Sequence, residues 1–239
     1  MIDLHCHLLP NIDDGPKTWE ESLEMASIAY QDGIKGAVCT PHWIQGTNWE
    51  PQPSTVIEKV NEFNSRLLDA GIDFKVYPGM EIGITANLAE FVSSDRILSL
   101  AQGKYLLLEV PFYSLPYGIE EIIDSLQKIG KEVILAHPER GREFQENPSG
   151  ILDFKELGVL LQITAGSLCG DFGDKAKKCA LDFAEMGVLD IVSTDAHSTR
   201  RRRPIVSSGL KILEAELGSD RIDELIENSY KVAGLKSTT

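Results

Sequence analysis

The five histidines of this chain lie within or directly after short apolar runs that are typical of β-strands; they are His5, His7, His42, His137 and His197. The first two stand in the alternating stretch at residues 2–7, and a strand directs both of these side chains to one face. Two neighbouring imidazoles can hold one metal ion. The sequence therefore predicts a metal site at the ends of strands.

Carboxylates in comparable positions enlarge this predicted site. Asp14 comes just after the first run, Glu81 follows Tyr77–Met80, and Glu109 lies inside the apolar run at residues 104–110. A glutamate within an apolar run is costly to bury unless a partner compensates its charge. Together with the histidines, these carboxylates predict a centre that holds more than one metal ion.

Apolar runs and helical segments alternate along the whole chain, without repeats or an evident linker. Strands are predicted at 2–7, 34–40, 74–81, 104–110, 132–136, 159–164 and 190–194. Helices are predicted at 18–33, 55–71, 87–93, 120–130, 151–158, 175–187, 205–217 and 222–232. The alternation predicts one α/β domain over residues 1–239, with a parallel sheet. A closed barrel would gather the strand ends at one rim, whereas an open sheet would spread them along a line.

Composition excludes several classes of partner. The net charge is −14, from 23 basic and 37 acidic residues, and this excess repels nucleic acid and anionic membranes. No apolar run reaches the roughly 18 residues that span a bilayer, and no signal peptide is evident. The four cysteines form no C-x-x-C pair, which suits a reducing compartment. We therefore expect a cytoplasmic protein without direct membrane insertion.

Six blocks in order resemble the polymerase and histidinol phosphatase (PHP) family. They are Asp3–His7, Asp13–Gly15, Thr40–His42, Gly79–Glu81, His137–Arg140 and Ser193–His197. The Asp-Asp-Gly-Pro variant and the His-Pro-Glu-Arg block are most similar to its bacterial protein-tyrosine phosphatase branch. That branch is manganese-dependent and acts in capsule and exopolysaccharide synthesis.

The resemblance implies a distorted (β/α)7 TIM-like barrel, the PHP fold, with a trinuclear metal site. Carried over by position, the metal ligands are His5, His7, Asp14, His42, Glu81, Glu109, His137, Asp195 and His197. These donors are nitrogen and oxygen only, which suits three manganese ions, with iron or zinc as alternatives.

Arginines are the expected phosphate ligands. The resemblance places Arg140 and either Arg202 or Arg203 on the phosphate, where guanidinium groups bind in bidentate fashion. Two plainer interpretations stay open at this stage. Arg140 could pair with Glu139 or Glu143 on the surface, and the run of four arginines from residue 200 could be a solvated loop.

The expected reaction is hydrolysis of phosphotyrosine by a metal-bridged hydroxide. The resemblance implies a phosphoprotein substrate, the tyrosine-rich tail of a bacterial kinase of polysaccharide synthesis. Loop aromatics could form a phosphotyrosine pocket or pack on their own loops; they are Trp43, Phe112, Tyr113 and Tyr117. The sequence gives no oligomeric state.

Competing functions differ in how well the sequence fits them. A cysteine-dependent phosphatase needs Arg six positions after its Cys, but Cys6, Cys39, Cys169 and Cys179 are followed there by Ile12, Gln45, Lys175 and Glu185. No P-loop motif is present. The alternative is a small-metabolite phosphatase of the histidinol-phosphate type on the same metal site. A binding module without catalysis and a nuclease fit less well, because the ligand set is intact and the chain is acidic.

Overall fold

Nine strands form the centre of residues 1–236, the part of the chain that this computed structural model describes. They are β1 (Ile2–Cys6), β2 (Gly36–Cys39), β3 (His42–Trp43), β4 (Lys75–Pro78), β5 (Glu81–Gly83), β6 (Tyr105–Glu109), β7 (Glu132–Ala136), β8 (Leu160–Thr164) and β9 (Ile191–Ser193). The last three positions of the predicted 1–239 domain lie outside the described residues.

The strands pair in parallel as two sheets, β1-β2-β4 and β3-β5-β6-β7-β8-β9. The strand predicted at 34–40 contains β2, and β3 lies just beyond its predicted end; the strand predicted at 74–81 contains β4 and the first residue of β5. β2 and β4 lie in the first sheet, while β3 and β5 belong to the second. Pro41, which has no N–H, separates β2 from β3. Gly79 separates β4 from β5, and a Cβ there would lie 2.7 Å from Val38 Cγ1. Counting β2 with β3, and β4 with β5, as one strand each gives seven strands, the number that the sequence predicted.

The barrel is closed between its first and last strands. Cys6 forms a parallel bridge with Ala196, and the Asp195 N–H donates to the His5 carbonyl at 2.8 Å. The predicted parallel α/β barrel is confirmed, and the division into two sheets is its distortion.

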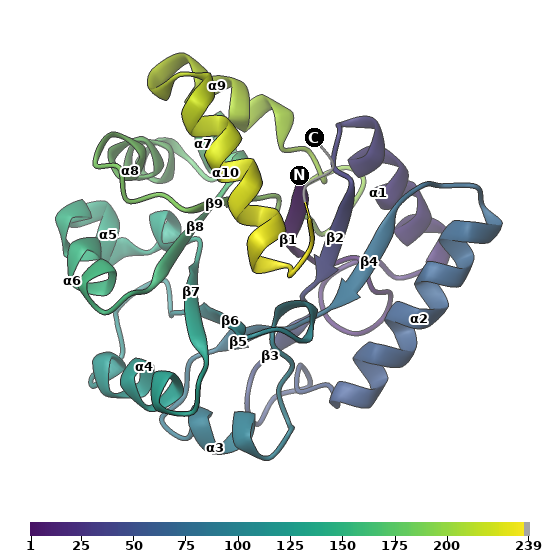
Figure 1. Cartoon of the computed structure of the whole chain (residues 1–239), viewed down its shortest axis with the longest axis horizontal. Coiled ribbons are helices and arrows are strands. Elements are labelled where there is room, and N and C mark those ends of the chain that lie inside the picture. Colours follow the sequence, from purple (N-terminus) through teal and green to yellow (C-terminus); the bar gives the residue numbers. More distant parts are fainter. Residues whose placement is uncertain (237–239) are drawn as a thin grey trace.

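Helices surround the strands in Figure 1, as expected for β/α units. All eight predicted helices are present: α1 (Trp19–Gln31), α2 (Pro53–Asp69), α3 (Leu88–Ser93), α4 (Ile119–Lys128), α6 (Ile151–Glu156), α8 (Asp174–Glu185), α9 (Ser207–Leu217) and α10 (Ser219–Val232). The sequence did not predict the short helices α5 (Arg142–Glu146) and α7 (Ala165–Cys169), or the 3-10 turns η1 (Leu100–Gln102), η2 (Pro138–Arg140) and η3 (Pro148–Gly150). No helix within residues 1–236 combines the length and apolarity that a bilayer span requires.

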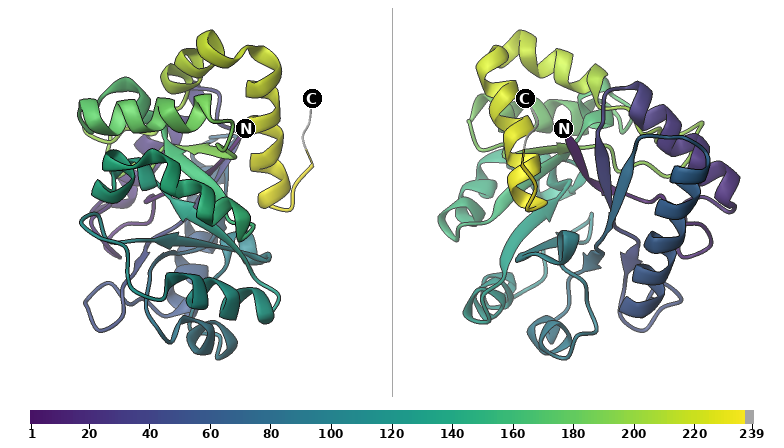
Figure 2. Two further views of the ribbon diagram at one scale, coloured as in Figure 1. Left: turned by 90° about the vertical axis from the view of Figure 1, so that its left-hand side faces the viewer. Right: turned by 45° about the vertical axis from the view of Figure 1, so that its right-hand side comes forward.

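Two apolar clusters hold the barrel together. The inner one contains Leu4, Leu107 and Ile134 from the strands, and Tyr230 of α10 joins it. Figure 2 shows α10, in yellow, beside the N-terminal end of β1, where Ser229 Oγ accepts the Ile2 N–H at 3.1 Å. The outer cluster packs strands against helices. Helix α10 thus covers the amino end of the barrel and leaves the opposite rim for the functional side chains.

Candidate metal centre and its cavity

The nine predicted metal ligands meet at the carboxyl end of the barrel, and we call them the nine-residue cluster. Eight of them form three overlapping groups whose ligand atoms lie within 4.8 Å of one another: His7, Asp14, His42 and His197; His5, His7, Glu81 and Asp195; His42, Glu81 and Glu109. The ninth, His137, brings its Nε2 to 2.8 Å from Glu81 Oε1 and 3.7 Å from Glu109 Oε1. Shared members join the three groups into one centre.

Glu81 lies at the middle of this cluster. Its Oε2 is 3.2 Å from His5 Nε2, 3.2 Å from His7 Nε2 and 2.9 Å from His42 Nδ1. The carboxylate comes from β5, His42 from the adjacent β3, His5 from β1, and His7 from the position directly after β1. Parallel strands that end at one rim therefore assemble donors that are far apart in the sequence.

Unpartnered polar atoms test whether the cluster fits metal ions. Among the described residues, the buried atoms without a hydrogen-bond partner include His42 Nδ1, Glu81 Oε2, Asp195 Oδ1 and His197 Nε2. Buried polar atoms are normally satisfied, so these four need an explanation. Nitrogen and oxygen donors that converge in this way, close together but without hydrogen-bond geometry, are what a divalent cation binds. The residues fit the predicted metal ions.

Side chains behind the cluster orient its histidines. Asp13 Oδ2 lies 2.7 Å from His7 Nδ1, and Gln162 Oε1 lies 3.0 Å from His5 Nδ1. Such partners fix which ring nitrogen faces a metal. These two roles were not predicted from the sequence, although an acidic neighbour of Asp14 and a glutamine inside the apolar run at 159–164 were visible signals.

The histidines of the cluster differ in protonation preference. Burial opposes the charged form of His5 and His7, but the charges of Glu81 and Asp195 beside His5 and of Asp13 beside His7 raise the pKa of both. Burial and the nearby Arg140 charge lower the pKa of His137 to about 4, and burial with the His7 charge lowers the pKa of His197 to about 4. Both imidazoles are therefore neutral near pH 7, with a lone pair available. Burial and the Glu81 charge raise the pKa of Glu109 to about 7. These carboxylates repel each other, and a bound cation would relieve that repulsion.

Backbone conformation is unusual at three positions of the site. His137, Asp195 and Arg202 have φ values of 35°, 49° and 49°, in the left-handed region that residues other than glycine rarely adopt. Backbone hydrogen bonds hold two of them. The His137 N–H donates to the Gln162 carbonyl at 2.8 Å, and the Asp195 N–H donates to the His5 carbonyl of β1. Strain of this kind is typical of functional sites.

Two arginines reach the cluster from loops. Arg140 Nη1 lies 2.7 Å and Arg202 Nη2 lies 2.5 Å from the same atom, Asp195 Oδ2. The surface pairing of Arg140 with Glu139 or Glu143 is not what the structure shows, because Glu139 is buried and accepts from Thr164 N–H and Ser167 Oγ. The structure brings Arg202, and not Arg203, to the cluster.

A cavity of about 520 Å³, which we call the cluster cavity, opens above these groups. Its wall contains Asp14, His42, Ile44, Trp49, Glu109, Phe112, Arg140, Gln145, Phe172 and Arg202. The Trp49 ring stacks on His42 with centroids 5.0 Å apart, and the Phe172 centroid lies 4.5 Å from the Arg140 guanidinium carbon. Three aromatic side chains, Trp49, Phe112 and Phe172, therefore line the cluster cavity.

Only one of the four aromatics considered from the sequence lines this cavity. Phe112 does, whereas Trp43 is buried against Phe91 of α3, and Tyr113 and Tyr117 are exposed on their loop. Trp49 and Phe172 were not predicted in this role. On a strand, the residue after His42 points to the opposite face of the sheet, so the period of two explains why Trp43 packs against the helices and not in the cavity.

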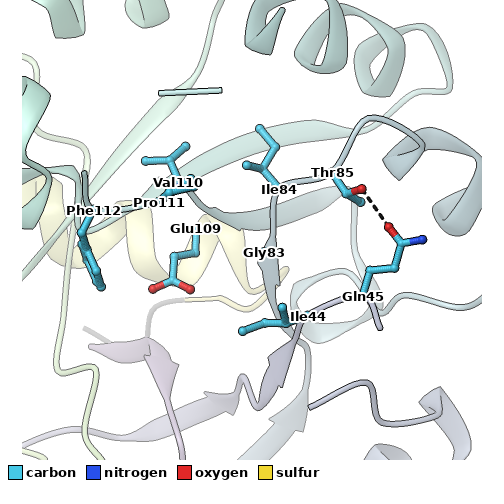
Figure 3. A pocket seen from close by; sticks show the side chains of 9 residues that line it. All are labelled: Ile44, Gln45, Gly83, Ile84, Thr85, Glu109, Val110, Pro111 and Phe112. Atoms are coloured by element: carbon cyan, nitrogen blue, oxygen red, sulfur yellow. Dashed lines mark hydrogen bonds between the residues drawn. The ribbon is translucent and has the colours of Figure 1, made fainter. Parts of the chain in front are cut away.

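An apolar recess of about 340 Å³ adjoins the cluster cavity, and both are lined by Ile44, Glu109 and Phe112. Figure 3 shows the Glu109 carboxylate between Phe112 and Ile44, with the Thr85–Gln45 hydrogen bond (2.8 Å) at the edge. Glu109 is thus the cluster member that stands between the recess and the cluster cavity.

Comparison with known proteins decides the family. A family model described as "Capsular polysaccharide synthesis, CpsB/CapC" matches residues 1–233. The chain belongs to the CpsB/CapC family. This result confirms the capsule-associated phosphatase branch of the PHP family that the sequence motifs predicted.

Members of the CpsB/CapC family are also similar over almost their full length. Tyrosine-protein phosphatase YwqE of Bacillus subtilis is 38% identical over 229 residues, which cover 96% of this chain and 90% of that protein. A solved structure, described as YwqE and Streptococcus pneumoniae CpsB, "unique metal-dependent tyrosine phosphatases", superposes with a TM-score of 0.94 and 37% identity, covering 100% of this chain and 96% of that one. An amidohydrolase from Mycoplasma synoviae, 12% identical, shares the fold with a TM-score of 0.60, covering 98% and 87% of the two chains.

Proposed function

We propose that this protein is a metal-dependent protein-tyrosine phosphatase. The observation that carries the proposal is the nine-residue cluster at the floor of a cavity that also contains two arginines and three aromatic rings. The similarity to YwqE, which is named a tyrosine-protein phosphatase, supports it. The proposed reaction breaks the bond between phosphorus and the phenolic oxygen and forms one between phosphorus and a water oxygen.

The nine-residue cluster would hold the metal ions. We propose three manganese ions, with iron or zinc as alternatives, because the donors are imidazole nitrogens and carboxylate oxygens. When bound, the metal ions would provide a hydrolytic water of lowered pKa and offset the charge of the phosphoryl group. The similarity to a structure described as metal-dependent supports this requirement.

Arg140 and Arg202 would bind the phosphoryl oxygens. Both guanidinium groups now share Asp195 Oδ2, so each can turn from that carboxylate to an incoming phosphate over a short distance. Phe172 supports this movement, since the guanidinium carbons lie 4.5 Å and 6.0 Å from its ring centroid. Bidentate donors from two loops would fix the phosphoryl group above the cluster.

The aromatic side chains would hold the tyrosine ring. Trp49, Phe112 and Phe172 surround the cluster cavity, and aromatic rings pack favourably on one another. The leaving phenolate has a pKa of about 10, well below that of an alkoxide, so the reaction depends less on a dedicated general acid. An aryl phosphate therefore fits this cavity better than a phosphoserine.

We propose that the substrate is the tyrosine-rich tail of a bacterial kinase of polysaccharide synthesis, and that the protein acts in the cytoplasm. The family, which is described by capsular polysaccharide synthesis, supports this partner. A peptide from such a tail would present the phosphotyrosine without a folded domain around it, so its ring could enter the cluster cavity.

The first test is hydrolysis of a phosphotyrosine peptide and of histidinol phosphate by metal-stripped protein, with and without added manganese. Manganese-dependent turnover of the peptide, with little turnover of histidinol phosphate, is the expected result. A preference for histidinol phosphate would replace the proposal with the small-metabolite phosphatase. No turnover of either, with bound metal confirmed by elemental analysis, would contradict both activities.

A further inference from the structure

Three of the four consecutive arginines are not used by the proposed reaction. Arg200, Arg201 and Arg203 line a second cavity of about 720 Å³, together with residues of α7, the loop that follows it, and the start of α9. We call it the arginine cavity. It adjoins the cluster cavity, because Phe172 and Arg202 belong to the walls of both.

The loop that carries these arginines has a defined shape. The His197 N–H donates to the Arg202 carbonyl at 2.9 Å, and the Arg201 N–H donates to Ser198 Oγ at 3.0 Å. Arg202 has the left-handed φ of 49°, which turns the chain between Arg201 and Arg203. The turn sends Arg202 to Asp195 and leaves Arg203 in the arginine cavity.

The four arginines of the run differ in how far nearby carboxylates compensate their charge. Within residues 1–236, Arg202 is the member of the run that forms an ion pair with a carboxylate, and no such pair within 4.0 Å involves the other three. Arg200 and Arg201 also face a depression that contains Glu20, Glu21 and Glu24, and Asp171 lines the arginine cavity itself. Arg203 is not part of that depression, so its positive charge is the least compensated of the three.

We infer that the arginine cavity binds an anionic side chain of the same peptide whose phosphotyrosine enters the cluster cavity. This inference rests on the proposed function and adds a determinant of substrate choice. The anion is a carboxylate or a second phosphotyrosine, since guanidinium groups bind both. Because Phe172 and Arg202 form a wall that both cavities share, the anion belongs to a residue close in sequence to the scissile phosphotyrosine, and about three extended residues span roughly 10 Å.

Three manganese-loaded assays with matched phosphotyrosine peptides test the inference. One peptide has neutral residues on both sides, the second has aspartate within three residues, and the third has phosphonomethylphenylalanine there. The phosphonate carries the anion without a scissile P–O bond. We expect kcat/KM to be about fivefold higher, or more, for an anionic peptide than for the neutral one, a preference of the size that one charge-assisted contact gives.

Substitution of Arg203 assigns this preference to the arginine cavity. Arg203→Ala should remove most of the ratio between anionic and neutral peptides, Arg203→Lys should keep most of it, and Arg203→Glu should reverse it. Lys128→Ala is the matched control, because Lys128 is an exposed cation at the end of α4, which leads into the opposite end of the barrel. It should leave the ratio unchanged.

The outcomes separate the inference from the proposed function. A larger gain with the phosphonate than with aspartate identifies a second phosphotyrosine as the anion, and equal gains identify any carboxylate-sized anion. Equal kcat/KM for all three peptides, or a ratio that Arg203→Ala does not change, overturns the inference while the hydrolysis of the neutral peptide upholds the phosphatase. No hydrolysis of the neutral peptide would instead count against the proposed function.

Discussion

At the scale of single residues, Asp195 joins several parts of the site. Its Oδ2 forms ion pairs with Arg140 and Arg202, and its Oδ1 lies 3.3 Å from His5 Nε2. Burial would raise its pKa, but the charges of His5 and Arg140 hold the pKa of this carboxyl well below its ordinary value. An ionised carboxylate therefore stands between the other members of the nine-residue cluster and the two arginines that we propose bind phosphate.

Replacement of Arg140 by alanine should remove one of the two phosphate donors. We expect kcat/KM for a phosphotyrosine peptide to fall about 10²–10³-fold, the usual cost of losing a donor to developing negative charge. Arg142→Ala is the control, because this neighbouring arginine is exposed and pairs with Glu146. Unchanged kinetics of the Arg140 variant would remove this residue from the reaction.

The four thiols should differ in reactivity. Burial raises the pKa of Cys179 to about 12, and burial also raises the pKa of Cys6 and Cys39, whereas Cys169 is half-buried. At pH 8, a thiol of pKa 12 is thiolate in about one molecule in ten thousand. Iodoacetamide should therefore label Cys169 first, as peptide mapping by mass spectrometry can measure. Early labelling of Cys6 in the folded protein would contradict this order.

At the scale of elements, the sequence predicted every long helix and the order of the strands, because periodicity and glycine ends are local signals. It missed α5 and α7, which are five residues each and too short to show a helical period. It also treated β1 as uniformly alternating. Ile2 and Leu4 face the inner cluster but Cys6 packs in the outer one, because the pairing with β2 shifts between Asp3 and Cys6. Such a shift has no sequence signature.

The residues of the site also divide into those with a local sequence signal and those whose position depends on the folded structure. The nine-residue cluster was predictable because its residue types are rare in apolar runs and match motifs. Trp49 and Phe172 were not, since both lie in loops whose paths depend on the folded structure. The choice between Arg202 and Arg203 also needed the left-handed turn at Arg202, which four identical residues cannot reveal.

The packing of α9 on α7 gives a prediction at this scale. A Cβ at Gly209 would lie 2.9 Å from the Ala165 carbonyl oxygen and 3.0 Å from its Cα. Gly209→Ala should therefore destabilise the protein by about 1–3 kcal/mol, despite the roughly 1 kcal/mol that alanine gains in an unconstrained helix. Urea unfolding measures the change. Lys211→Ala, at an exposed position of α9, is the control, and a more stable Gly209 variant would show that the helices can separate without cost.

At the scale of the whole molecule, the cluster collects ligands from residue 5 to residue 197, so metal binding couples distant parts of the barrel. Ligands that bind the folded state add stability, about 2.7 kcal/mol at a concentration a hundred times the dissociation constant. For a chain of this size, that gain corresponds to about 5–10 °C in Tm.

Removal of metal by a chelator should therefore lower the Tm by about that amount, and added manganese should restore it. Differential scanning calorimetry measures both steps. The Glu81→Gln variant provides the control, because the loss of the central carboxylate should make the Tm largely insensitive to manganese. A Tm that does not respond to metal in the original protein would contradict the role of the cluster.

The closure of the barrel between β1 and β9 has a consequence for biosynthesis. Cys6 and Ala196 pair directly, and Asp195 and His197 follow β9. A ribosome-bound chain that has exposed only its first 180 residues carries seven of the nine predicted ligands but lacks β9 and the bridge that closes the barrel onto β1. The complete nine-residue cluster therefore cannot assemble before Asp195 and His197 have emerged, and its completion is a late event that coincides with closure of the barrel.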